Sequence, residues 1–211
     1  MKLEELFNQV TSHEGEFICE QINNESELKV VTFKHDYSEP VDLKRHKDIE
    51  EKYAKIPKLI DFYHTFGSLR LYVDEESEDS GRYIAAPDEW EELEEGYKDW
   101  IDMLEEEELE DFPSWIEDCL VIGETPQSGN YILIPLDGEE SGCVYEFDHD
   151  GFELTKEAEN IEVYIGKLIN IDSQTLTNIA SHMRFIESDP MIQWWIRDLK
   201  DNKGVHVSTR T

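Results

Sequence analysis

Negative charge is concentrated in one stretch of this chain, and that stretch limits how the chain can fold. Between Asp74 and Asp118 there are 21 acidic side chains and only two basic ones, whereas the whole 211-residue chain has 51 acids and 19 bases. An unpaired buried carboxylate is costly, so nearly all of these side chains must face water. The apolar residues between them must therefore share one face of each element.

Residues 87–104 meet this requirement as an amphipathic helix. Pro87 suits a first helical turn, and apolar residues then recur at helical spacing: Trp90, Leu93, Tyr97, Trp100, Ile101 and Leu104. The acids between them are predicted to point outward: Glu91, Glu92, Glu94, Glu95, Asp99 and Asp102. The run 105–108 is expected to fray or form a loop because neighbouring like charges repel. Residues 74–80 show no apolar period and are expected to form a mobile loop.

Charge this dense destabilises a folded chain by self-repulsion and attracts cations over about 8–10 Å at physiological salt. Two interpretations stay open. The acids could be ordinary solvated surface or an adaptation to salt, but salt adaptation would spread the excess evenly. The alternative is a face that binds a basic protein. The candidate partner-binding residues are Glu91, Glu92, Glu94, Glu95, Asp99, Asp102, Glu105, Glu106 and, separately, Trp194.

Trp194 belongs to a predicted C-terminal helix that begins at Pro190. In that helix the inner face would carry Ile192, Trp195, Ile196 and Leu199. Adjacent helical residues are about 100° apart, so Trp194 would be partly exposed, and exposed tryptophan is common at binding hot spots. Packing beneath the N-terminal segment is the competing interpretation for Trp194.

The rest of the chain predicts an α+β fold, a central, mainly antiparallel sheet flanked by helices with extra helices at the C-terminus. An opening helix places Leu3, Leu6, Phe7 and Val10 on one face. Strands are predicted over 28–35, 69–73, 119–122, 130–135 and 143–147. Further helices are predicted over 48–53, from Pro57 to a stop at Gly67, and over 161–168 and 175–186. We expect residues 1–211 to form a single domain.

No residues in the sequence point clearly to catalysis, a metal or a cofactor. Asp148-His149-Asp150 is the most site-like cluster, but adjacent strand residues point to opposite faces and do not converge on a metal. It is expected to be a strand end followed by a turn, with His149 stacked on the sheet. The other histidines are scattered, as surface or packing residues would be: His13, His35, His46, His64, His182 and His206.

The cellular setting follows from what the sequence lacks. Cys19, Cys119 and Cys143 have no CxxC spacing, which favours buried reduced thiols in a cytoplasmic protein. An acidic excess without a basic patch argues against direct binding of nucleic acid. No run of about 18 apolar residues predicts a membrane span, and the N-terminus lacks the apolar core of a secretory signal. The sequence leaves the oligomeric state open.

Four segments stand out by their order and spacing: 56–67, 120–124, 129–134 and 142–150. Together they resemble the SUKH superfamily, which includes a fungal cell-wall-synthesis regulator and many bacterial immunity proteins. The resemblance covers about residues 53–170. The N-terminal segment 1–52 and the C-terminal helices 171–211 would pack on this core. Phe66-Gly67 stands where the family usually has Asn-Gly, and the chain from Thr175 onward lies outside the pattern.

The resemblance implies a sheet wrapped by helices, with no catalytic residues. Bacterial members of the superfamily typically bind and neutralise a toxin domain, often a nuclease. The first hypothesis is therefore an immunity protein that binds a basic toxin domain. The alternatives are a regulatory scaffold with several cellular partners, as the fungal relative suggests, and a metal-dependent hydrolase that uses Asp148, His149 and Asp150.

Overall fold

The computed structural model describes residues 3–42, 47–126, 128–186 and 189–210. The strands are β1 (Gly15–Gln21), β2 (Asn24–Tyr37), β3 (Leu69–Asp74), β4 (Arg82–Ile84), β5 (Cys119–Thr125), β6 (Asn130–Pro135), β7 (Val144–Asp148), β8 (Glu153–Ala158), β9 (Arg184–Ile186), β10 (Gln193–Asp201) and β11 (His206–Ser208). The helices are α1 (Leu3–Ser12), α2 (Lys47–Lys52), α3 (Pro57–Tyr63), α4 (Trp90–Ile101), α5 (Glu106–Leu109), α6 (Ile161–Ile169) and α7 (Ser173–His182), and a short 3₁₀ turn over Pro87–Glu89 leads into α4.

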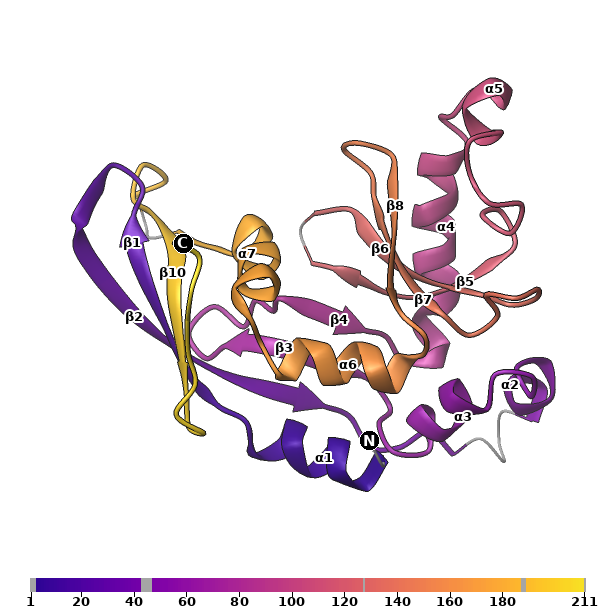
Figure 1. Cartoon of the computed structure of the whole chain (residues 1–211), viewed down its shortest axis with the longest axis horizontal. Coiled ribbons are helices and arrows are strands. Elements are labelled where there is room, and N and C mark those ends of the chain that lie inside the picture. Colours follow the sequence, from indigo (N-terminus) through magenta and orange to yellow (C-terminus); the bar gives the residue numbers. More distant parts are fainter. Residues whose placement is uncertain (1–2, 43–46, 127, 187–188, 211) are drawn as a thin grey trace.

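The strands form one antiparallel sheet in the order β11-β10-β1-β2-β3-β4-β5-β6-β7-β8, and β9 pairs with β10. Helix α7 lies between the two ends of this curved sheet, with β10 on one side and β6 and β8 on the other (Figure 1). The predicted fold class, an α+β arrangement with a central antiparallel sheet, is confirmed.

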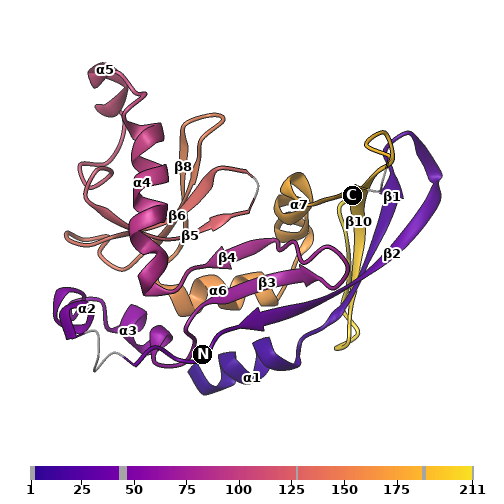
Figure 2. The ribbon, with the colours of Figure 1, turned by 180° about the vertical axis from the view of Figure 1, so that it is seen from behind.

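Two apolar clusters cover opposite faces of the strands that follow the acidic segment. On β6, Ile132 and Ile134 belong to the main core with α1, α3, α6 and α7, whereas Tyr131 and Leu133 belong to a second core beneath α4. Successive strand residues face opposite sides, which explains this alternation. Every residue of β6 is buried because the strand is covered on both faces. In Figure 2, α4 lies in front of β5 and β6.

The predicted third C-terminal helix is wrong, because this segment is strand β10. Its pairing with β1 sets Cys19 opposite Ile196 and Glu20 opposite Trp195. The apolar run is short enough to fit both the helical period and the strand period. The helical spacing was therefore coincidental for its four predicted inner residues, Ile192, Trp195, Ile196 and Leu199. Alternate residues Trp194 and Ile196 are buried, so Trp194 is a core residue with 7% exposure and no surface candidate.

Two further helix boundaries differ from the predicted ones. The helix predicted over 175–186 ends at His182 as α7, and residues 184–186 form β9. The run 105–108 contributes to a short helix, α5, where a loop was expected. The Glu108 carboxylate accepts the backbone N–H of Glu105 at 2.9 Å, and acidic side chains are favourable at a helix N-terminus.

The loop predicted after residue 73 is present, although Asp74 itself ends β3 and is buried. Its carboxylate accepts the backbone N–H groups of Glu76 and Ser77 at 3.0 and 2.8 Å, which holds the turn. The predicted mobility of this loop stays a prediction.

Candidate functional site

Helix α4 presents an acidic surface, as predicted. It buries Tyr97 and Ile101 against the second core and Trp90 against the main core. At 100° per residue, the six acids predicted to face outward fall within roughly half of the helix circumference. We define the acidic ridge as these side chains and the exposed Glu105 that follows: Glu91, Glu92, Glu94, Glu95, Asp99, Asp102 and Glu105. Six are exposed, and Glu94 is half-buried.

The structure does not bring all predicted partner-binding residues together. Trp194 lies on β10, near one end of the sheet. The acidic ridge lies on α4, which is beside β5 and β6 and far from β10 (Figure 1). The side chain of Glu106 lies outside the described residues. The acidic surface is therefore the part of the prediction that the fold assembles.

Carboxylates on and beside the ridge repel one another. Lys98 is the one base on α4, and its Nζ contacts the Glu94 carboxylate at 2.7 Å, so the lysine neutralises only one of the acids. On the neighbouring strand β5, the pKa of Glu124 is raised by burial and by the negative charges of Glu89 and Glu92. A cation bound against this surface would lower its electrostatic free energy.

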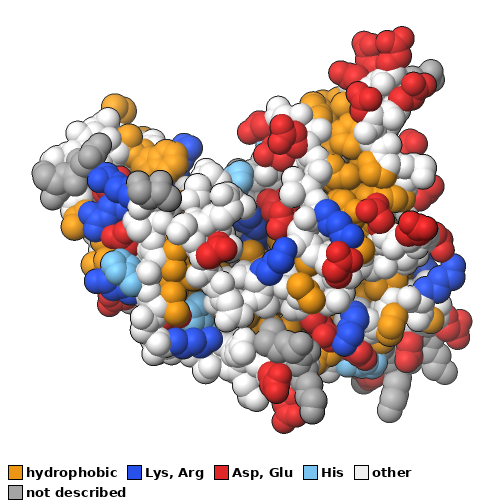
Figure 3. Space-filling model, in the orientation of Figure 1, with side chains coloured by type: hydrophobic (Ala, Val, Ile, Leu, Met, Phe, Trp, Pro, Cys, Tyr) orange, Lys and Arg blue, Asp and Glu red, His pale blue; other side chains and the backbone are white. Residues whose placement is uncertain are grey.

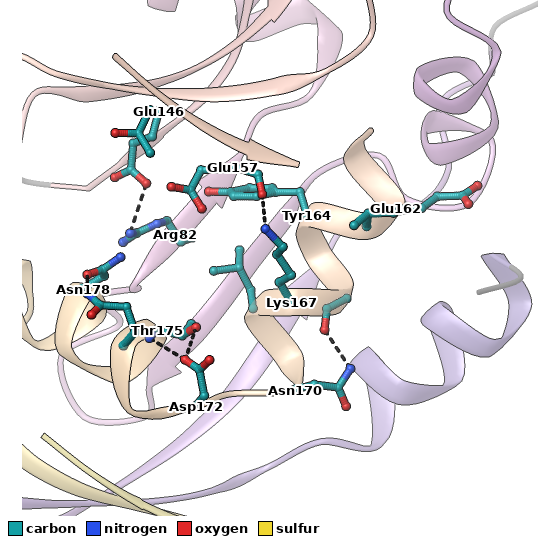
Figure 4. Close-up of a pocket in the computed structure, with 15 residues that line it drawn as sticks. Arg82, Glu146, Glu157, Glu162, Tyr164, Lys167, Asn170, Asp172, Thr175 and Asn178 are labelled. Carbon is teal, nitrogen blue, oxygen red and sulfur yellow. Dashed lines mark hydrogen bonds and ion pairs between the residues drawn. The ribbon is translucent and has the colours of Figure 1, made fainter. Parts of the chain in front are cut away.

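A separate cleft of about 820 Å³ lies between the β7–β8 hairpin and helices α6 and α7 (Figure 4). Sequence reasoning missed it because its lining comes from five separate elements. Buried Arg82 lies at its base. Arg82 Nη1 donates to the carbonyl of Gly81 at 2.8 Å, and Nη2 lies 3.4 Å from Glu146 Oε2. Thr125 Oγ1 also donates to Glu146, at 3.2 Å.

The cleft lining carries both signs of charge. Burial and the charge of Glu146 raise the pKa of Glu157, and Lys167 Nζ donates to the Glu157 carbonyl oxygen (Figure 4). Arg82 Nε and the Tyr164 hydroxyl oxygen are buried within the protein. Arg82 and Glu146 therefore link β4 to β7 inside the fold, and the cleft shows no preference for one ligand charge.

Asp148-His149-Asp150 lies at the end of β7 and in the turn that follows, as predicted. The His149 ring packs on Trp100 with 4.4 Å between centroids, and His149 Nδ1 lies 3.0 Å from Asn130 Oδ1. Asp148 Oδ1 accepts the Asp150 N–H at 3.0 Å. Within the described part of the chain, no three His, Cys, Asp or Glu side chains are grouped so that they could hold a metal ion.

Two of the histidines expected to be surface or packing residues form a buried hydrogen-bonded pair. His13 Nδ1 lies 2.8 Å from His35 Nε2, and His13 Nε2 lies 3.2 Å from Asp201 Oδ2. His35 Nδ1 accepts the backbone N–H of Tyr72. All four ring nitrogens have partners within the protein, so this pair has a structural role. Its members are 22 residues apart, which is why no short motif reveals them.

The three cysteines are free and buried, as predicted. Among the helices of the described ranges, none combines the length and apolarity that a membrane crossing requires.

Comparison with protein families gave a match to the model described as the SMI1 / KNR4 family (SUKH-1), over residues 40–167. Comparisons with curated proteins and with solved structures each gave no match. The matched range covers most of the predicted 53–170 core and contains α3, the acidic ridge, β3 to β8 and most of α6.

Proposed function

Because the chain belongs to the SMI1 / KNR4 family (SUKH-1), we propose that it is an intracellular immunity protein that binds and neutralises a basic toxin domain without performing chemistry. The observation that carries the proposal is the acidic ridge. Its acids occupy one exposed side of α4, and the single base on that helix is already paired.

The physical advantage of the ridge is rapid capture. A nuclease must hold phosphate, so its active cleft is typically positive, and an anionic surface is complementary to such a cleft. Electrostatic steering can raise association to about 10⁸–10⁹ M⁻¹s⁻¹ at low salt. Fast association matters for an immunity protein because free toxin causes damage before it is bound.

The test uses the protein encoded beside this gene as the partner. Its association and dissociation rates with the purified chain are measured over a range of salt concentrations. The ridge variant carries Glu91→Gln, Glu95→Gln, Asp99→Asn and Asp102→Asn. The control variant removes the same charge from exposed acids elsewhere on the molecule, with Glu14→Gln, Glu16→Gln, Glu39→Gln and Asp61→Asn.

We expect the ridge variant to associate at least about tenfold more slowly at low salt, and the control variant to stay within about twofold of the wild type. Equal slowing in both variants would assign the effect to net charge and not to the ridge. The absence of a complex with the neighbouring gene product would contradict the immunity role. Several weak complexes with cellular proteins would favour the scaffold alternative.

A further inference from the structure

A groove lined by both apolar and acidic side chains lies beside the acidic ridge, between the segment that follows α5 and the β7–β8 hairpin. Its volume is about 620 Å³. Four half-buried side chains supply most of its apolar lining: Leu104, Phe112, Phe152 and Leu154. In Figure 3, hydrophobic surface is visible just below α5, bordered by acidic side chains.

The fold holds these rings in place. Phe147 is fully buried beneath the groove, and its ring centroid lies 6.4 Å from that of Phe112 and 6.1 Å from that of Phe152. Phe152 has a positive φ of 48°, a conformation that a bulky residue rarely adopts. The turn after β7 thus places an aromatic ring at the groove where a glycine would fit the backbone more easily.

The rim of the groove is anionic. Glu108, Asp111 and Glu140 line it, and its one base, Lys156, contacts Glu159 at 3.2 Å. The Glu140 carboxylate accepts hydrogen bonds from the Tyr145 hydroxyl and, at 3.1 Å, from Trp115 Nε1. These bonds lower the pKa of Glu140 and fix a negative charge at the edge of the apolar floor.

We propose that this groove receives an amphipathic basic segment of the protein partner, with apolar side chains against Phe112, Phe152 and Leu154 and with Lys or Arg against the rim. The proposal rests on the proposed function and identifies where the partner is anchored. An apolar centre with a polar rim is the usual arrangement of a binding hot spot. A second copy of this chain is a poor occupant, because the chain has a net charge of −32 and the groove rim has the same sign.

Three labelled synthetic peptides serve as probes. The first is an amphipathic peptide of leucine and lysine. The second replaces every leucine with serine at equal charge, and the third replaces every lysine with glutamate. Binding to the full-length chain is measured by fluorescence anisotropy at physiological salt. We expect the leucine–lysine peptide to bind at least tenfold more tightly than the serine–lysine peptide, and the glutamate peptide not to bind.

Groove variants locate the binding. Phe152→Asn removes the ring with a residue that tolerates positive φ, and Leu154→Ser removes a second apolar contact. Each is expected to weaken the leucine–lysine complex at least fivefold. Matched controls are Leu28→Ser and Val30→Ser, exposed apolar residues on β2, which should change the affinity less than twofold. Chemical shifts of the Leu104 and Leu154 methyl groups in the wild type provide a readout that needs no variant.

The outcomes separate this inference from the proposed function. Equal binding of both lysine peptides, or unchanged affinity in the groove variants, would show that charge alone acts and would overturn the groove proposal. Failure of all peptides to bind would also overturn it. Neither result bears on the immunity role, which the neighbouring gene product tests by itself.

Discussion

His35 accepts the backbone N–H of Tyr72 through Nδ1 at 2.9 Å, and this contact fixes the protons of a buried chain of side chains. Because Nδ1 must accept, the proton of His35 lies on Nε2 and is donated to His13 Nδ1. The proton of His13 then lies on Nε2 and is donated to Asp201. Adding a proton to either ring would set two N–H groups against each other.

This arrangement predicts a loss of stability in mild acid. Burial lowers the pKa of His35 from 6.5 to about 3, and it also lowers the pKa of His13. The nearby Lys203 lowers both pKa values further, whereas Asp201 raises that of His13. As the pH falls, the unfolded chain binds these protons first, so the free energy of unfolding decreases from about pH 6.5 toward pH 3.

For His35 alone the expected loss is about 1.4 kcal/mol at pH 5.5, relative to neutral pH. Urea unfolding between pH 7.5 and 5.5 measures it. The variant His35→Gln, compared over the same range, should show a shallower pH dependence than the wild type. Parallel curves for the two proteins would contradict the assignment.

A second prediction concerns the buried pair of Arg82 and Glu146. Glu146→Ala leaves the Arg82 guanidinium buried without its closest carboxylate, and we expect it to reduce the free energy of unfolding by about 3 kcal/mol. Adding Arg82→Met should restore part of this loss because the uncompensated charge is then gone. Urea unfolding of the two single variants and the double variant gives the coupling, and purely additive losses would be evidence against a buried ion pair.

Two glycines in the matched family range should respond very differently to alanine. A Cβ at Gly123 would lie 2.1 Å from the Tyr83 backbone oxygen on β4, so Gly123→Ala should cost about 2–3 kcal/mol or prevent folding. A Cβ at Gly96 on α4 would lie 2.5 Å from the Tyr131 hydroxyl oxygen, so this side chain must shift, and the cost is offset by the gain of about 1 kcal/mol in helix propensity for alanine. Thermal unfolding should therefore show little change for Gly96→Ala, and equal shifts for both variants would refute this distinction.

The thiols should differ in reactivity. Burial raises the pKa of Cys19 and of Cys119 to about 12. Burial also raises the pKa of Cys143, but there the neighbouring Lys156 ammonium favours the thiolate. Because the thiolate is the reactive form, iodoacetamide at pH 8 should modify Cys143 first and the other two only after unfolding. Mass spectrometry of tryptic peptides measures the order. Rapid native labelling of Cys19 would show that the N-terminal hairpin opens readily.

The sequence predicted elements whose pattern is strong over a long run. In α4 the apolar spacing and the dense acids agree, so only one orientation keeps the charges in water. Short strands were harder. Strands β1, β4, β8 and β11 were missed, and β4 and β11 have only three residues each. Strand β10 was taken for a helix because a short apolar run fits two periods, and its pairing with β1, far away in the sequence, decided the outcome.

The groove and the buried polar contacts could not be predicted from the sequence, because they also join residues that are far apart in the chain. Tyr72 has a φ of 59° at a point where the register between β2 and β3 shifts, and its N–H turns to the His35 side chain. Nothing in the local sequence marks that bulge. The groove joins residues from the 104–113 segment and the β7–β8 hairpin, which are separated by up to about fifty positions in the chain.

The sequence by itself determined the acidic face, because burying that many carboxylates would cost more than the fold could offset. It also determined the α+β class, through the order of its apolar periods. The tertiary structure alone decided which strands became neighbours, and thereby which histidines met in the core and which aromatic rings were left at the surface. Those choices depend on contacts between residues far apart in the sequence. Such contacts stabilise the protein only when the sheet and its helices have packed together.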